Sequence, residues 1–336
     1  MTVIEIQRLV EGANANLTDK ERNCVVGDSG SGAPRFEVYH FAFSLCSEKV
    51  RTVLAEKQVS YISHDVQILP PSMENYYPGY VKLRMKGGEV TADRMVGAYT
   101  GRSSTESEGF DPCVVPTVVD HKAGKVLVDS KAICMYLDKI INGGSELVPN
   151  DIADEVQRQV SIVDRTPHVA VLYGADPDGD VRPDFVQEAM VGIHDFKVMK
   201  LRENMKEARD DEKLMAAYEH KIQKETAAKH FVQTPGDMRA AISEIKQIVR
   251  ELDFDLATSN GDWVCGERYT LADVVWAVSL FRLKWLGMGY LWEAENASLD
   301  RIANYAKRLF DRLSFQQAVI HWPRSPPSKY VREYYS

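Results

Sequence analysis

Strand and helix patterns alternate between residues 35 and 147. "FEVYHF", "VSYISHDVQI" and "VVPTVVD" have the β-branched and aromatic character of short strands, helical spacing follows the first of them, and "KVLVDSKAICMYLDKII" reads as a strand followed by a helix. Such alternation predicts an α/β domain. From residue 148 onwards the pattern is nearly all helical, which predicts a second, all-α domain.

The chain divides unevenly around these two domains. Residues 1–34 end in "GDSGSGAP" and are expected to form a flexible N-terminal extension. The first domain is expected over 35–147, with a long polar insert at 70–112 that is either disordered or functional. The helical domain is expected over 148–324, and 325–336 is an aromatic, basic tail that either covers the site or is loosely ordered.

Composition narrows the function classes. The 336 residues carry a net charge of −8, which disfavours nucleic acid or an anionic membrane as the main partner and favours small-molecule chemistry. The five cysteines are widely spaced, with no Cys/His set at zinc spacing, so neither a disulfide framework nor a metal site is expected. With no membrane-spanning run and no secretory signal, we expect a cytoplasmic protein.

One cysteine stands out in "FSLCSEK". Cys46 falls at a strand-to-helix turn, with Ser44 or Ser47 as the N-cap of the following helix. Helix-start N–H groups carry partial positive charge and stabilise a thiolate, so Cys46 is a candidate nucleophile. The alternative is a small buried hydrophobe. The polar face of this helix is expected to comprise Glu48, Lys49, Arg51, Thr52, Glu56 and Lys57.

Two further turns are candidates for binding. Pro116 interrupts a β-branched run, and a cis Val115–Pro116 bond would leave the Val115 backbone free to pair with a ligand; an ordinary trans proline at a strand edge fits equally. Asp129 and Ser130 precede helical spacing. They fit helix capping alone, or capping together with carboxylate binding by the helix-start N–H groups and the serine hydroxyl.

Taken in order, these features resemble the glutathione transferase fold, a thioredoxin-like domain joined to an all-α domain. "YTLADVVWAVSLFRL" adds a T-x-x-D capping box, Thr270 and Asp273, that we interpret as a folding element. Within that superfamily the chain resembles the glutathione-dependent reductive dehalogenases of chlorinated hydroquinones, through "FSLCSEK", "EGFDPCVVPTVVDH", "DSKAIC" and "TPHVAVLYGADPDGD". The insert at 70–112 departs from the ordinary transferase pattern.

The resemblance implies a mechanism with two site residues. Ser44 would stabilise the thiolate of glutathione, the co-substrate, for attack on a halogenated aromatic. Cys46 would then remove the glutathionyl group as a mixed disulfide, which a second glutathione resolves to give chloride and oxidised glutathione. Val115, Pro116, Asp129 and Ser130 would bind glutathione. No metal is implied, and the superfamily usually assembles as homodimers.

The sequence says less about which residues bind the aromatic substrate. Arg165, His168 and Tyr173 lie at spacings that bring them together if one helix continues past Pro167, and one of them would bond the hydroquinone oxygen. A carboxylated ring such as a chlorinated gentisate fits Arg165 as well as a plain hydroquinone. His168 and Tyr173 also fit purely structural roles.

Two other functions use the same residues. A thiol transferase acting on glutathionyl-hydroquinones or aryl ethers would use Cys46 but release no halide. A non-catalytic binding or redox module would keep the fold without needing an aromatic pocket.

Overall fold

The structure is a computed structural model and describes residues 3–17, 19–28, 32–91, 93–293 and 299–335. Its strands are β1 (Asn23–Val26), β2 (Phe36–His40), β3 (Tyr61–Asp65), β4 (Thr117–Asp120) and β5 (Lys125–Val128). The helices of the first half are α1 (Val3–Asn14), α2 (Leu45–Glu56), α3 (Pro78–Thr91), α4 (Thr105–Glu108) and α5 (Ser130–Ile140).

The second half is helical, as the sequence predicts. Its helices are α6 (Ala153–Arg165), α7 (His168–Tyr173), α8 (Asp184–Met190), α9 (Ile193–Glu207), α10 (Glu212–Gln233), α11 (Pro235–Thr258), α12 (Leu271–Trp285), α13 (Tyr290–Glu293), α14 (Asp300–Phe310) and α15 (Leu313–Phe315). Short 3-10 turns are η1 (Lys20–Arg22), η2 (Glu74–Tyr76), η3 (Asn150–Ile152) and η5 (Arg332–Tyr334), and η4 (Gln316–Ile320) is π-helical. None of the described helices combines the length and apolar character needed to cross a bilayer.

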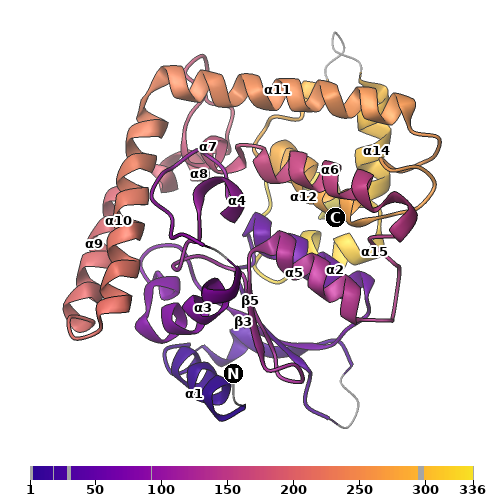
Figure 1. Cartoon of the computed structure of the whole chain (residues 1–336). Coiled ribbons are helices and arrows are strands. Elements are labelled where there is room, and N and C mark those ends of the chain that lie inside the picture. The colour runs from indigo at the N-terminus through magenta and orange to yellow at the C-terminus, as the bar shows by residue number, and fades with distance from the viewer. Residues whose placement is uncertain (1–2, 18, 29–31, 92, 294–298, 336) are drawn as a thin grey trace.

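The five strands form one mixed sheet in the order β1-β3-β2-β4-β5. Only β2 and β3 are parallel; the other neighbouring pairs are antiparallel. Helices cover both faces, with α1 and α3 on one side and α2 and α5 on the other, where the helical domain packs (Figure 1). A mixed sheet of this kind followed by helices confirms the predicted thioredoxin-like domain joined to an all-α domain.

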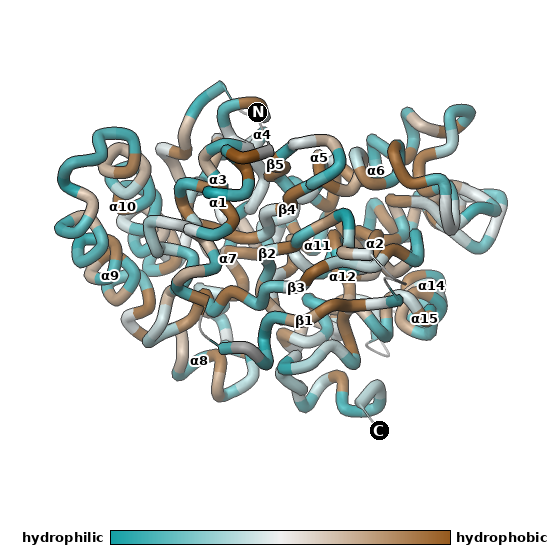
Figure 2. The backbone as a smooth tube through the Cα atoms, turned by 90° about the horizontal axis from the view of Figure 1, so that it is seen from below, coloured by the Kyte–Doolittle hydropathy of each residue, from teal (hydrophilic) through white to brown (hydrophobic). Residues whose placement is uncertain are grey.

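Alternating side chains of β2 supply two separate cores. Phe36 and Val38 join the large cluster that continues through α2 and α5 into α12, whereas Tyr39 points into the cluster beneath α1 and α3. Hydrophobic segments therefore gather along the strands and central helices, while the hairpin of α9 and α10 at the edge is largely hydrophilic (Figure 2). The first core crosses the boundary between the domains, so it fixes their relative position.

The capping box predicted at the start of α12 is present. The Thr270 hydroxyl and the Asp273 carboxylate cap reciprocally, and Asp273 also accepts a hydrogen bond from the Tyr305 hydroxyl at 2.7 Å. Both capping residues are fully buried. Their role is structural, as expected.

The flexible extension predicted over 1–34 is wrong for most of the described residues there. Helix α1 buries Ile6, Val10 and Ala13 against α3, and β1 pairs with the outer edge of β3. The apolar spacing i, i+4, i+7 in α1 is a helix signal, and it stabilises the segment because α3 offers an apolar partner. Residues 29–31 of "GDSGSGAP" lie outside the described residues.

The insert at 70–112 and the tail at 325–336 are both folded against the rest of the chain. The insert contains η2, α3 and α4, and α3 packs on α1 and β5. In the tail, the Ser328 hydroxyl donates to the Trp285 carbonyl oxygen at 2.7 Å and Val331 is fully buried. No described tail residue lines the cavity discussed below.

The polar face expected on α2 is not solvated. Glu48 pairs with Arg282 of α12 at 3.0 Å, and Lys49 pairs with Asp164 of α6 at 2.8 Å, with all four side chains buried. Burial alone would lower the pKa of Lys49, but the charge of Asp164 outweighs it and holds that pKa above its usual value. The helix that begins beside Cys46 is thus fixed to the helical domain by buried charges.

We predict that Lys49→Met lowers the free energy of unfolding by about 3 kcal/mol, because it leaves Asp164 buried without its partner. Urea denaturation measures the change. The double variant Lys49→Met/Asp164→Leu is expected to recover most of the loss, since no charge then stays buried.

The exposed pair of Lys229 and Asp195 provides the control. Lys229→Met should change the unfolding free energy by less than about 0.5 kcal/mol. An equally small change in the unfolding free energy of Lys49→Met would contradict the prediction that losing the partner of buried Asp164 destabilises the fold.

Candidate active site

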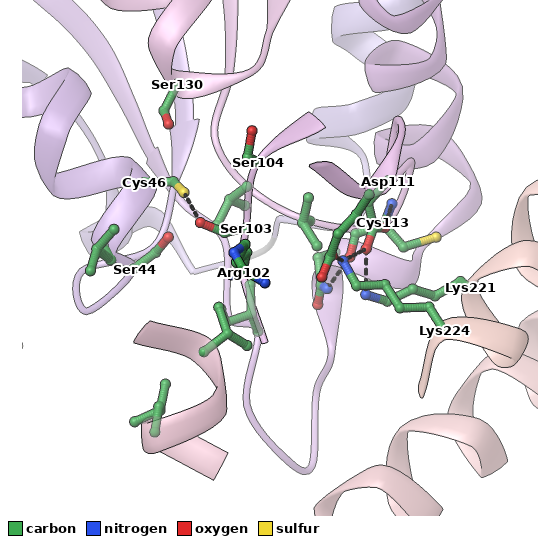
Figure 3. A pocket seen from close by; sticks show the side chains of 18 of the residues that line it. Ser44, Cys46, Arg102, Ser103, Ser104, Asp111, Cys113, Ser130, Lys221 and Lys224 are labelled. Carbon is green, nitrogen blue, oxygen red and sulfur yellow. Dashed lines mark hydrogen bonds and ion pairs between the residues drawn. The ribbon is translucent and has the colours of Figure 1, made fainter. Parts of the chain in front are cut away.

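Most of the candidate site residues predicted from the sequence line one cavity between the two domains. It is lined by Ser44 and Cys46 at the start of α2, by Val115 and Pro116 before β4, by Asp129 and Ser130 at the start of α5, and by His168 and Tyr173 of α7. Figure 3 shows Ser44, Cys46 and Ser130 at one end, and Asp111, Cys113, Lys221 and Lys224 at the other.

The start of α2 positions Ser44 and Cys46. Ser44 is the N-cap, and its side-chain oxygen accepts a hydrogen bond from the Ser47 N–H at 3.4 Å. Cys46 is then the second helical residue and is partly exposed. Its sulfur lies 3.4 Å from the Ser103 hydroxyl oxygen.

Ser103 belongs to the insert, and two contacts hold this segment over the site. The carbonyl oxygen of Gly101 accepts hydrogen bonds at 3.0 Å from the Val169 and Ala170 N–H groups at the start of α7. Gly101 has φ +76°, and a Cβ there would lie 2.7 Å from the Ala170 side chain, so this approach requires glycine. The Arg102 guanidinium pairs with Glu244 of α11 at 2.6 Å. The insert is therefore part of the site.

The Val115–Pro116 bond is cis, as one of the two sequence alternatives proposed, and both residues line the cavity. The Pro116 carbonyl oxygen accepts a hydrogen bond from Arg84 of α3 at 2.5 Å. This bond ties the turn to a buried guanidinium. The Val115 side chain itself packs in the core beneath α1 and α3.

At the start of α5, capping is done by Asp129. Its carboxylate accepts hydrogen bonds from the Ala132 N–H at 3.0 Å and the Thr105 N–H at 3.4 Å. Asp129 has φ +69°, an uncommon conformation for a residue with a Cβ, which its two hydrogen bonds stabilise. Ser130 follows as the first helical residue, buried and facing the cavity. Because Asp129 already caps the helix, the Ser130 hydroxyl is available to a ligand.

The three residues predicted to bind the aromatic ring do not all lie at one site. Thr166 is extended before Pro167, so α6 ends at Arg165 and α7 begins at His168 instead of one helix running through. Arg165 is exposed and is not among the described residues that line the cavity, so its predicted place in the ring site is wrong. Its carbonyl oxygen accepts from Arg102 at 2.6 Å.

His168 and Tyr173 do line the cavity, in different environments. His168 Nε2 is hydrogen-bonded to the Ser279 hydroxyl at 2.8 Å, and burial lowers the pKa of His168 to about 3. This side chain is neutral and already paired, which matches the structural role left open above. The Lys197 ammonium lies over the Tyr173 ring, 4.0 Å from the ring centroid, and the ring centroids of Tyr173 and His194 are 5.1 Å apart.

Sequence reasoning missed the charged far end of the cavity. Lys221 of α10 pairs with Asp111 at 2.8 Å and with Glu225 at 2.9 Å, and Glu225 also pairs with His194 of α9 at 2.8 Å. Burial would raise the pKa of Glu225, but Lys197 and Lys221 outweigh it and hold that pKa well below its usual range. In the sequence, Lys221 and Glu225 form part of a charged stretch from Lys197 to Lys229 that looks like an ordinary solvated surface. No group of three or more metal-ligating side chains occurs among the described residues.

Comparisons with known proteins identify the family and the fold. Residues 43–140 match the family "Glutathione S-transferase, N-terminal domain". Among solved structures, the beta-etherase LigF from Sphingobium sp. strain SYK-6 is similar with a TM-score of 0.55 and 16% identity, covering 84% of this chain and 98% of that one. A glutathione S-transferase III gives 0.53 at 17% identity, covering 88% and 100%. At these identities the structures support the fold alone.

Sequence relatives are closer. A 2,5-dichlorohydroquinone reductive dechlorinase of Sphingobium indicum is 50% identical, with 93% of this chain and 90% of that protein covered. A tetrachloro-p-hydroquinone reductive dehalogenase of Sphingobium chlorophenolicum is 25% identical, with 85% and 96% covered. The chain belongs to the glutathione transferase superfamily and, within it, to the family of these reductive dehalogenases.

The site predicts different effects for the two residues at the start of α5. We expect Ser130→Ala to weaken glutathione binding about fivefold by removing one hydrogen bond, with little change in stability. Isothermal titration with glutathione measures the affinity. Asp129→Ala should instead lower the free energy of unfolding by about 1 kcal/mol, because it removes the cap.

The two variants control each other. A fall in unfolding free energy with unchanged glutathione affinity in Ser130→Ala would mean that Ser130 only caps the helix.

Proposed function

We propose that this chain reductively removes chloride from a chlorinated hydroquinone, with glutathione as co-substrate, Ser44 activating the glutathione thiol and Cys46 acting as the second thiolate. The observation that carries the assignment is the placement of Ser44 at the N-cap and Cys46 in the first turn of α2, with both residues lining one cavity. Membership of the reductive dehalogenase family supports the reaction class.

Cys46 is the cysteine suited to this role. Cys113 also lines the cavity, but it is fully buried and its pKa lies well above the usual value, first because of burial and then because of the Asp111 charge. A thiol that stays protonated is a poor nucleophile. Cys46 is partly exposed, at a helix start and beside the Ser103 hydroxyl. That hydroxyl can donate a hydrogen bond to the Cys46 thiolate once it forms.

The proposed reaction balances in three steps. The glutathione thiolate, hydrogen-bonded to Ser44, forms a carbon–sulfur bond to the ring, and chloride leaves. The Cys46 thiolate then attacks the ring-bound sulfur, giving a mixed disulfide with Cys46, while the ring carbon keeps the electron pair and takes a proton. A second glutathione reduces this disulfide. Two thiols are thereby oxidised to one disulfide for each carbon–chlorine bond replaced by carbon–hydrogen.

Glutathione is proposed to bind along the turns that flank Cys46. The cis turn at Val115–Pro116 and the start of α5 at Asp129 and Ser130 line the cavity on this side. Helix-start N–H groups and a serine hydroxyl suit a carboxylate of the tripeptide. The ring is proposed to lie beyond, towards Tyr173.

A reducing environment follows from the same chemistry. Regeneration of Cys46 consumes reduced glutathione, and all five cysteines of the chain are free thiols in the structure. We therefore propose that the protein acts in the cytoplasm.

The roles of Ser44 and Cys46 are separable. We predict that Cys46→Ser still consumes 2,5-dichlorohydroquinone but accumulates a stable glutathionyl-hydroquinone, because a hydroxyl near neutral pH is a far poorer nucleophile towards sulfur than a thiolate. Ser44→Ala should slow substrate consumption, by about tenfold or more, without building up the adduct. Chromatography measures both species, and a chloride electrode measures release.

Cys24→Ser is the matched control, since Cys24 is exposed on β1 and away from the cavity. It should behave like wild type. Intact-mass spectrometry of wild type quenched during turnover should show one added glutathione on the peptide that contains Cys46. Normal formation of dechlorinated product by Cys46→Ser would refute the mechanism.

We also propose a homodimer, on the resemblance to the superfamily. Size-exclusion chromatography with light scattering should give twice the mass of the 37.9 kDa chain. A mass of one chain at micromolar concentration would remove this proposal.

A further inference from the structure

Five side chains that line the cavity carry a buried polar atom with no hydrogen-bond partner among the residues that the structure describes: Asn75, Tyr99, Glu108, His194 and Arg282. Glu108 and Arg282 are held in ion pairs. The atoms that bear on the ring site are Nε2 of His194, on α9, and the hydroxyl of Tyr99, in the insert. His194 is only 5% exposed. Buried polar groups in folded proteins are nearly always paired, so unpaired atoms that line a cavity indicate a polar ligand. Both side chains line the same cavity, from separate elements.

The partner of His194 fixes which of its nitrogens carries the proton. Nδ1 lies 2.8 Å from a carboxylate oxygen of Glu225. Glu225 is ionised, because Lys197 and Lys221 outweigh the effect of burial on its pKa, so it only accepts hydrogen bonds. Nδ1 must therefore donate, and in the neutral ring Nε2, which has no partner among the described residues, carries the lone pair. This is the arrangement of a general base oriented by a carboxylate.

Tyr99 supplies the complementary group. Burial, reinforced by the nearby charge of Glu108, raises the pKa of Tyr99 well above its usual value, so the hydroxyl keeps its proton. Its ring packs edge-to-face on Phe231, with centroids 5.3 Å apart, which holds the hydroxyl in place. The cavity thus presents one acceptor, His194 Nε2, and one donor, the Tyr99 hydroxyl. A phenolic hydroxyl, which both donates and accepts, satisfies both.

The surroundings favour an aromatic ring at this end. The Tyr173 ring lies 5.1 Å from the His194 ring, and the Lys197 ammonium lies over Tyr173 at 4.0 Å. His194 also differs from His168, the other histidine of the cavity, whose Nε2 is already bonded to Ser279. Of the two, only His194 has an open nitrogen.

We infer that His194, oriented by Glu225, is a catalytic residue that accepts the hydroxyl proton of the ring, and that Tyr99 binds the same end of the substrate. The inference rests on the proposed function and specifies its ring site. The O–H bond of the hydroquinone breaks, its electron pair stays on the oxygen, and the proton moves to His194 Nε2, giving a phenolate and an imidazolium. Nothing is oxidised or reduced in this step. The phenolate would lie near Lys197.

The test is chloride release from 2,5-dichlorohydroquinone with glutathione. His194→Asn keeps an amide N–H able to reach Glu225 but has no base, so kcat should fall about 100-fold or more. Tyr99→Phe removes one hydrogen bond and should raise KM threefold to tenfold with little effect on kcat. His194→Gln serves as a second variant if the asparagine protein does not fold.

His230→Asn is the matched control, because His230 is exposed on α10 and does not line the cavity. It should leave kcat and KM unchanged. Mixed-disulfide formation at Cys46 with oxidised glutathione, followed by mass spectrometry, should be equally fast in wild type and His194→Asn, since that step needs no ring. A folded His194→Asn protein with kcat within threefold of wild type would overturn the inference.

A failure of the proposed function would look different. Wild type would then release no chloride, and the ring site would be tested by calorimetric titration with unchlorinated hydroquinone. Binding to wild type that weakens at least fivefold in both His194→Asn and Tyr99→Phe would support the ring site. Equal affinity in all three proteins would overturn it.

Discussion

The site depends on the buried charges that hold α2 between the two domains. Glu48 pairs with Arg282 and Lys49 with Asp164, and each pair joins the helix that carries Cys46 to a different helix of the second domain. Buried ion pairs add little net stability compared with apolar packing, but they penalise wrong arrangements strongly, because a displaced charge stays buried without a partner. The first turn of α2 is thereby fixed relative to the helices that form the rest of the cavity.

The cavity has two chemically different ends. Near Cys46 the lining comes from helix starts and a cis-proline turn, where backbone N–H groups and serine hydroxyls dominate. At the far end it comes from α9, α10 and the insert, with lysine and carboxylate side chains paired among themselves. The first end suits a peptide with a thiol, and the second suits a ring with hydroxyl groups. The insert passes between them, held by Gly101 on α7 and by Arg102 on α11.

Local features could be predicted from short stretches of residues. The strand at 36–40, the helix that begins beside Cys46 and the capping box of Thr270 and Asp273 follow from patterns shorter than one helix or hairpin, whereas α1, β1 and α3 were not predicted. Ser44, Cys46 and Ser130 were found because a helix start is itself a short signal. The cis bond at Pro116 was one of two alternatives that a local pattern allowed. Residue order and resemblance then gave the fold and the family.

The partner of each polar side chain depends on how distant segments pack together. The α2 residues that look solvated are buried because α6 and α12 present opposite charges, and α1 is ordered because α3 covers its apolar face. Of the two cavity histidines, sequence favoured His168, yet His168 is paired with Ser279 while His194 keeps an open nitrogen. Periodicity reports the neighbours of a residue along its own helix. Partners more than a hundred positions away, such as Asp164 for Lys49 or Ser279 for His168, leave no local pattern and appear only when the chain is folded.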